Sequence, residues 1–282
     1  KWIGGTLDIF TRTVLFNCKP SCQHNYFDIL ERYYAEKDYS ADTVMMLLDA
    51  AMAIDRSACT PGFVKQIKSF LEGVYDRYDR SVNIAVLKAA RHYFDQFSNE
   101  EYQSELRRIM NLAERKEDFD KNLATMFLDD LKTGTPWIQK VANISFMLDY
   151  IENYDDQGRM MHIATHFSNL VKVSETVTVR KAAGDALLAI IGRMPMEQRN
   201  ELTVELFNGL ELGDYQFSKY VPDYLGIIML YLPPKELDES IDELQKVLES
   251  GNEMAVSSVV NTLGVIAEHY AQYKGRFMES TD

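Results

Sequence analysis

The sequence predicts an all-α protein, built as a right-handed superhelical solenoid of antiparallel helix pairs. Three observations favour this fold. Glycine and proline, the residues that most often interrupt helices, number only 14 and 7 in 282 residues. Apolar residues recur at the helical spacing along nearly the whole chain. In the second half of the chain, similar segments return after about 38 to 41 residues.

The first part of the chain is expected to form four helices. Each candidate helix has apolar residues at i, i+3, i+4 and i+7, the pattern of a helix with one buried face. The four segments are Tyr26–Tyr34, Asp42–Ile54, Phe63–Tyr75 and Val82–Phe94.

Capping residues mark several helix starts. A threonine before a proline supplies an N-cap and a first helical residue at Thr60-Pro61 and again at Thr135-Pro136. The stretch Ser98–Glu101 fits a capping box, in which the serine and the glutamate each bond the other's backbone amide. The best strand candidate, Val171–Val179, is expected to be a turn between helices, because the repeat places it there.

The repeat is clearest in three segments that follow one another at a constant interval of about 38 residues. We call this interval, which separates Leu187 from Leu225, the repeat spacing. Each segment contains a leucine and, three residues later, an isoleucine. These residues are Leu187, Leu225 and Leu263, followed by Ile190, Ile228 and Ile266. One helix–turn–helix unit cannot bury its apolar face alone, so we expect neighbouring units to stack.

The helices between these segments repeat as well. We expect them at about Glu197–Leu212 and Glu236–Ser250, where Leu206 and Leu244 are again separated by the repeat spacing. Both segments combine apolar residues at helical spacing with a carboxylate-rich opposite face. The repeating unit is therefore a pair of helices.

The segment Val177–Ile191 resembles the first helix of a HEAT repeat, in which a Val-Arg pair opens the helix and an Ala-Leu pair packs inside. These places are held by Val179, Arg180, Ala186 and Leu187. The resemblance covers residues 135–270 and implies a HEAT- or armadillo-like solenoid. In such a solenoid the second helix of each pair lines a concave, protein-binding face.

The expected organisation is one continuous solenoid domain with four segments. An N-terminal extension covers residues 1–21, and weakly repetitive helix pairs cover residues 22–134. Acidic HEAT-like repeats cover residues 135–271, followed by a tail at residues 272–282. Because the chain begins at Lys1 instead of a methionine, we expect it to be a piece of a longer or processed protein.

The charge of −13 is unevenly distributed and indicates the type of partner. Residues 195–282 contain 16 of the 43 acidic residues but only 6 of the 30 basic residues. An acidic surface repels phosphate backbones, so we expect no nucleic-acid partner. A protein or peptide with a basic surface is the expected partner.

Two further features bear on location. The sequence lacks an apolar run of about 18 residues, so we expect no insertion into a membrane. Its three cysteines are too few for a disulfide framework in a chain of 282 residues. A reducing, cytoplasmic compartment is therefore expected.

Two histidines raise the question of a metal site. His162 and His166 are four residues apart, which places both rings on one helix face, as in zinc proteases. The residue after His162 is not the glutamate that such proteases use as a general base, and no third ligand is evident. The alignment that pairs Phe167 with Phe207 places His166 opposite Leu206, so we expect a buried or half-buried structural histidine pair, with His166 packed between helix layers and contact with a partner as the alternative.

A second candidate cluster contains Cys18, Cys22, His24 and Cys59. Four such ligands could close a tetrahedral structural zinc site. Their spacing is not that of a standard zinc knuckle, and Pro20 interrupts it. We therefore expect no metal and no cofactor, with structural zinc at this cluster as the alternative.

The expected function is a protein–protein interaction scaffold or regulatory module, not an enzyme. The sequence has no Ser/His/Asp order, no phosphate-binding glycine loop and no nucleotide fingerprint. The alternatives are an all-α metal-dependent enzyme and a HEAT-like protein that acts on nucleic acid. The expected binding residues form an acidic ladder on the concave face, which we define as Glu201, Glu205, Glu239, Asp242 and Glu243.

Overall fold

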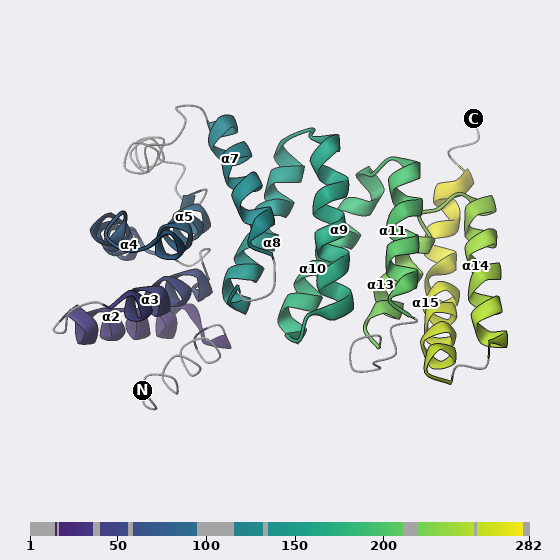
Figure 1. The fold of residues 1–282 in the computed structure, drawn as a ribbon, viewed down its shortest axis with the longest axis horizontal. Coiled ribbons are helices and arrows are strands. Elements are labelled where there is room, and N and C mark those ends of the chain that lie inside the picture. The colour runs from purple at the N-terminus through teal and green to yellow at the C-terminus, as the bar shows by residue number, and fades with distance from the viewer. Residues whose placement is uncertain are drawn as a thin grey trace. The chain divides into compact units, whose positions relative to one another are not determined.

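The computed structural model describes residues 15, 17–35, 40–55, 59–94, 116–131, 135–210, 219–250 and 253–278. All regular elements in these ranges are helical, which confirms the all-α prediction (Figure 1). The chain divides into two compact units, Lys1–Phe146 and Met147–Asp282. The sequence division at residue 135 rests on the strength of the repeat and stays a prediction. In the described part of the chain, no helix combines the length and apolar character needed to cross a bilayer.

Unit 1 is a group of helices that ends within α8. α3 packs against α2 and α5, and α4 packs against α5. The helices are α2 (Pro20–Ala35), α3 (Ala41–Ala53), α4 (Pro61–Val74), α5 (Arg80–Phe94), α7 (Lys116–Asp129) and α8 (Trp137–Asn153).

The helix starts in unit 1 follow the capping residues closely. Thr60 caps α4 as predicted, since its hydroxyl accepts a hydrogen bond from the Phe63 amide at 3.3 Å and Pro61 is the first helical residue. α8 begins at Trp137, one residue later than the second Thr-Pro pair predicts. The predicted capping box at Ser98–Glu101 lies outside the described residues.

Aromatic side chains fill the core of unit 1. Phe27 of α2 is completely buried and meets Phe63 and Phe70 of α4 edge-on, with ring centroids 5.7 and 5.9 Å apart. Phe127 of α7 meets Phe146 of α8 in the same geometry at 5.2 Å. Edge-to-face contacts of this kind favour one arrangement of the helices over others.

Unit 2 contains the segments in which the sequence predicts repeats. α9 packs against α10 and α11, α13 packs against α10, α11 and α15, and α14 packs against α15. The strand candidate at Val171–Val179 contains the expected turn at residues 174–176, and its remaining residues belong to the end of α9 and the start of α10. The helices are α9 (Gln157–Val173), α10 (Val177–Ile190) with a 3-10 turn (Ile191–Arg193), α11 (Met196–Asn208), α13 (Val221–Met229), α14 (Pro234–Glu249) and α15 (Glu253–Met278).

Burial in α10, α13 and α15 follows the repeat spacing. Ala183, Val221 and Val259 are each 0% exposed. The predicted isoleucines are buried in all three helices, and the predicted leucines are buried in the first two and half-buried in the third. These three helices are therefore equivalent elements, with corresponding residues directed into the core.

Glycines set how closely these equivalent helices approach. A Cβ at Gly184 of α10 would lie 2.1 Å from Cζ of Tyr224 on α13. A Cβ at Gly226 of α13 would lie 2.7 Å from Cγ1 of Val265 on α15. In both cases a glycine makes room for a side chain of the next helix in the series. Since packed interiors tolerate little overlap, this shape complementarity helps to fix the register.

Arg199 of α11 ties the ends of two helices together. Its Nε donates to the Met194 carbonyl at 2.8 Å, its Nη2 to the Gly192 carbonyl at 3.1 Å and its Nη1 to the Tyr231 carbonyl at 3.0 Å. These carbonyls follow α10 and α13, where the last backbone acceptors of a helix lack partners within it. A cation is favoured at this end of a helix, although burial lowers the pKa of Arg199.

Candidate functional site

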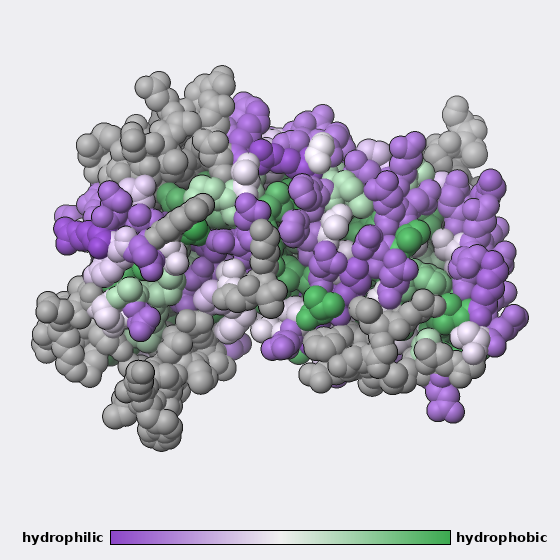
Figure 2. Space-filling view, viewed as in Figure 1, coloured by the Kyte–Doolittle hydropathy of each residue, from purple (hydrophilic) through white to green (hydrophobic). Residues whose placement is uncertain are grey.

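The acidic ladder lies on α11 and α14, the two helices that the sequence predicts for it. Leu206 and Leu244 are both 0% exposed, which confirms the register between these helices. Hydrophilic side chains cover the α14 side of the molecule in Figure 2. Of the ladder carboxylates, Glu205 is half-buried, and Glu201, Glu239, Asp242 and Glu243 are exposed.

Lysines on α14 pair with two of the ladder carboxylates. Lys235 lies 3.7 Å from Glu239, and Lys246 contacts Glu243. The hydrogen bond to Glu243 raises the pKa of Lys246, and the charge of Asp242 adds to this effect. Such exposed pairs contribute little to stability, so these side chains can rearrange when a partner approaches.

Glu205 differs from the rest of the ladder because it joins two helices. Its Oε2 lies 3.0 Å from Nζ of Lys172, a buried residue of α9. A Cβ at Gly209 would lie 2.8 Å from Cγ of Lys172, so this glycine makes room for the lysine stem. Glu205 therefore has a structural role in packing α9 against α11.

His166 is half-buried, as predicted, but His162 is exposed, and the pairing of His166 with the buried Leu206 is wrong. The two rings are close, with centroids 5.5 Å apart. The core position of α9 belongs to Phe167, which is 0% exposed. The larger apolar ring occupies the interior, and the imidazole beside it lies at the edge of the core.

The cause of this error is the offset between α9 and α11. The buried residues of the two helices match when Phe167 is paired with Leu206. The sequence alignment instead pairs Phe167 with Phe207, which is one position later. The shorter offset places His162 opposite Glu201 and His166 opposite Glu205. The coinciding buried pairs are Ile163 with Leu202, Ala164 with Thr203, and Phe167 with Leu206.

The corrected register gives two rows of equivalent outward positions on α9, α11 and α14. Val204 lies beside these rows on α11, is 59% exposed and adds an apolar contact point. The surface is thus carboxylate-rich on α11 and α14 and carries imidazoles on α9. One row contains His162, Glu201 and Glu239, and the other contains His166, Glu205 and Glu243.

The cysteine cluster does not form a ligand set. Cys18, Cys22 and Cys59 are free thiols. Within the described ranges, no three His, Cys, Asp or Glu side chains lie close enough together to hold a metal ion. His24 instead stacks on Phe63, with centroids 4.2 Å apart and an interplanar angle of 9°. Its ring is used for packing, and burial lowers its pKa.

Unit 1 contains a buried polar network that the sequence analysis missed. Asp49 of α3 is 0% exposed and accepts a hydrogen bond from Gln139 of α8 at 2.8 Å. Gln139 accepts in turn from Lys88 of α5 at 3.0 Å, and Lys88 lies 2.7 Å from Asp130. Burial lowers the pKa of Lys88, and the hydrogen bond and charge of Asp130 oppose this effect.

A second buried pair lies nearby in the same unit. The guanidinium of Arg91 lies 3.4 Å from Asp120 and is stacked 4.7 Å from the ring centroid of Phe146. Arg91 is 3% exposed and Asp120 is 2% exposed. The sequence signal for such residues is a single charge inside an apolar helix, as at Asp49 and Lys88. That signal shows burial but does not identify the partner.

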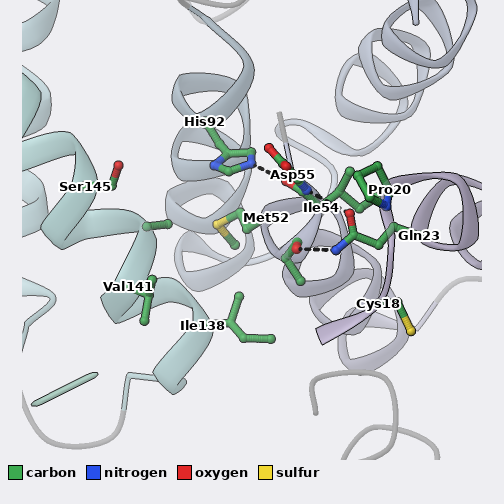
Figure 3. Close-up of a pocket in the computed structure, with 12 residues that line it drawn as sticks. Cys18, Pro20, Gln23, Met52, Ile54, Asp55, His92, Ile138, Val141 and Ser145 are labelled. Atoms are coloured by element: carbon green, nitrogen blue, oxygen red, sulfur yellow. Dashed lines mark hydrogen bonds between the residues drawn. The ribbon is translucent and has the colours of Figure 1, made fainter. Parts of the chain in front are cut away.

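A pocket of about 380 Å³ lies in unit 1 (Figure 3). Its walls come from the start of α2, the ends of α3 and α5, and the first half of α8. Met52, Ile54, Ile138 and Val141 give it an apolar lining. Ligand pockets commonly measure about 300–1,000 Å³. The pocket lies at the lower end of this range.

The polar groups around the pocket are held by hydrogen bonds. Gln23 donates to the Leu15 carbonyl at 2.9 Å and accepts from the Asp55 amide at 2.9 Å. His92 Nε2 lies 2.8 Å from the Ile54 carbonyl, and this nitrogen must carry the proton because a carbonyl only accepts. The pocket is thus formed without rearrangement of its polar groups.

Comparison of the chain with protein-family models, with curated proteins and with solved structures gave no match.

Proposed function

We propose that this chain is a HEAT-like, right-handed solenoid that acts as a protein–protein interaction scaffold or regulatory module. We place its binding surface on the outward face of α11 and α14, with a basic protein or peptide as the partner. One observation carries the proposal: buried and exposed residues both follow the repeat spacing. Leu206 and Leu244 are buried at this spacing, and Glu201 and Glu239 are exposed at the same spacing.

The charges of this face suit a basic partner. Within the described residues, ion pairs involve Glu205, Glu239 and Glu243, whereas Glu201 and Asp242 face solvent. Carboxylates arranged along one face raise the association rate of a basic surface more than the final affinity. The exposed Val204 offers an apolar contact beside them.

The two alternative functions, nucleic-acid binding and metal-dependent catalysis, predict a different surface charge or a measurable activity. A HEAT-like protein that acts on nucleic acid would present a basic face to phosphates, whereas the outward faces of α11 and α14 carry carboxylates. An all-α metal-dependent enzyme would turn over a substrate in a metal-dependent manner. We also propose a cytoplasmic location, which the three free thiols support, because reduced cysteines are typical of that compartment.

The test uses a charge-reversed variant and quantitative affinity capture. Glu201→Lys, Glu239→Lys and Asp242→Lys change exposed side chains, so the melting temperature should change little. Glu205 is left unchanged, because a lysine there would face Lys172 in a half-buried position. We expect the variant to lose basic proteins that the wild-type chain captures from cell extract at low salt.

The matched control reverses three exposed carboxylates elsewhere, Glu72→Lys, Glu152→Lys and Glu249→Lys. It has the same net charge as the test variant but leaves the ladder carboxylates unchanged. It should therefore capture the same proteins as the wild-type chain. Captured proteins should also be released as the salt concentration rises, since salt screens exposed charges. Equal capture by both variants would show that the face of α11 and α14 does not bind the partner.

A further inference from the structure

The helices that line most of the pocket in Figure 3 are also the helices that the buried polar network of unit 1 connects. The network joins Asp49 of α3, Lys88 of α5 and Gln139 of α8. Two of its members lie about one helical turn before a lining residue of the same helix, since Met52 follows Asp49 and His92 follows Lys88. A site whose walls are held by such supporting hydrogen bonds needs little rearrangement to accept a ligand.

The side-chain N–H groups that line this pocket already donate within the protein. Gln23 donates to the Leu15 carbonyl at 2.9 Å and to the Ala53 carbonyl at 3.3 Å. His92 Nε2 donates to the Ile54 carbonyl at 2.8 Å. The described lining contains no lysine or arginine. It therefore offers little to an anionic ligand, which needs N–H donors or cations.

The charge of the pocket comes from one carboxylate. Asp55 supplies the only Asp or Glu side chain of the described lining, and this residue is exposed to solvent. Figure 3 shows it beside the His92 ring. In the apolar part of the wall, Met52 and Ile138 are buried and Val141 is half-buried. A carboxylate next to apolar walls suits a cation that carries an apolar body.

We propose that this pocket binds a small organic amine, in which a protonated ammonium group is attached to an apolar body. The ammonium group contacts the Asp55 carboxylate, and the apolar body packs against Met52, Ile138 and Val141. An ammonium group has N–H donors and no acceptor, so it needs none of the donors that the lining uses internally. The inference goes beyond the proposed function, because the pocket belongs to unit 1 and the acidic ladder belongs to unit 2.

Three probes of similar size separate the effect of charge from that of apolar contact. Phenethylamine is a cation, phenethyl alcohol is neutral and hydrocinnamate is an anion. Each probe is titrated into the full chain, and the methyl NMR signals of Met52 and Ile138 give its dissociation constant. We expect the amine to bind about three- to fivefold more tightly than the alcohol, because an exposed ion pair gives a modest gain. The anion should bind more weakly than either.

Asp55→Asn tests the charge. It removes the carboxylate at nearly constant size, so the affinity for phenethylamine should fall to that for phenethyl alcohol, and the affinity for the alcohol should not change. Asp42→Asn is the matched control, because Asp42 is an exposed aspartate of the same unit and is not part of the described lining. This control should bind all three probes like the wild-type chain.

Val141→Trp tests the location. The indole ring fills the pocket, so the amine and the alcohol should bind about tenfold more weakly or worse. Ile29→Trp is the matched control, because Ile29 is 63% exposed on α2 and is not part of the described lining. Melting temperatures verify that each variant is folded. If Val141→Trp is not folded, Ala142→Trp fills the same pocket from another half-buried position.

Four results would overturn the proposal. The first is the absence of saturable binding by phenethylamine. The second is tighter binding of hydrocinnamate than of phenethylamine. The third is an affinity for the amine that Asp55→Asn leaves unchanged. The fourth is binding that persists in a folded variant with tryptophan in the pocket. None of these results depends on the ladder carboxylates, so the proposed function is tested separately.

Discussion

The two units of this chain hold their helices in register by different interactions. Unit 1 buries charged residues, among them Asp49, Lys88 and Arg91, and connects them through hydrogen bonds and ion pairs. Unit 2 aligns its equivalent helices through glycine notches at Gly184 and Gly226. Buried charged groups thus take a larger part in packing the helices of unit 1, whereas unit 2 adds close contacts at glycines to the polar ties made by Arg199 and Lys172.

The two kinds of contact differ in how far apart their partners lie in the sequence. Each glycine contact joins a helix to the next helix of the series, although Gly184 and Gly226 are not separated by the repeat spacing. A buried charge needs a partner of defined chemistry, and in unit 1 that partner is far away in sequence. Asp49 and Gln139, for example, are separated by 90 residues. Such a pair could recur in another helix pair only if all of its hydrogen-bonding partners recurred as well.

The largest expected effect comes from breaking the polar network of unit 1. Arg91→Met removes the cation beside Asp120 and leaves that carboxylate buried. We expect unit 1 to lose about 3–5 kcal/mol of stability, the usual cost of removing one partner of a buried ion pair. Tryptophan fluorescence in a urea titration measures this loss, because Trp2 and Trp137 both belong to unit 1.

The double variant Arg91→Met, Asp120→Leu tests the cause. It removes both charges and should recover most of the lost stability, because apolar groups can replace a buried ion pair. A double variant as unstable as the single one would show that Arg91 acts through its packing on Phe146 and not through its charge.

The second expected effect is a contrast between two equivalent glycines of unit 2. Gly226→Ala places a methyl group against Val265, so we expect a destabilisation of about 1–3 kcal/mol from overpacking. Gly264→Ala meets no described atom within 4 Å and should stabilise α15 by about 0.5–1 kcal/mol through helix propensity. Hydrogen exchange of the unit 2 helices measures both changes. Equal effects at the two glycines would contradict the assigned register.

The sequence predicted the fold of unit 2 in more detail than that of unit 1. Periodicity gave helices in both units, and the repeat spacing located buried positions such as Leu225 and Ile228. This was possible because each residue of one repeat can be aligned with a residue of the next repeat in the same sequence. Partners such as Gln139 for Asp49 depend on the three-dimensional arrangement of helices, which periodicity does not contain.

The helices that carry the ladder carboxylates were predicted, whereas their contacts were not all predicted and their binding role stays a prediction. The ladder carboxylates lie on the expected helices, yet the pairing of Glu205 with Lys172 was missed. An offset wrong by one position also paired His166, instead of Phe167, with the buried Leu206. In a helix, a shift of one position rotates every side chain by about 100°, so small errors of alignment move residues between core and surface.

A smaller effect is expected from acid, and in unit 1 it should depend on His24. Burial lowers the pKa of His24 below 6.5, its value in the unfolded chain. As the pH falls through 6.5, the unfolded chain binds a proton that the folded chain resists, so the free energy of unfolding decreases. His24→Phe keeps the stacking on Phe63 and removes this proton, so its stability should fall less between about pH 7 and pH 5.

Urea titrations at several pH values, monitored by tryptophan fluorescence, measure this difference. His162→Gln is the control, because His162 is an exposed histidine of unit 2. Its titrations should follow those of the wild-type chain. If the His24→Phe chain lost stability as steeply as the wild type, other groups would account for the acid sensitivity of unit 1.

The smallest expected effect concerns the reactivity of one thiol and leaves the fold unchanged. Burial, together with the nearby charge of Asp55, raises the pKa of Cys59 to about 11. Only the thiolate reacts with alkylating reagents, so at pH 8 Cys59 should react more slowly with iodoacetamide than the exposed Cys22. Mass spectrometry of the modified peptides over time gives both rates.

Asp55→Asn removes the neighbouring charge and should accelerate Cys59 without affecting Cys22, whereas equal rates for both thiols in the wild-type chain would show that Cys59 is not shielded. A modest acceleration is expected, because burial is the larger of the two causes and remains in the variant.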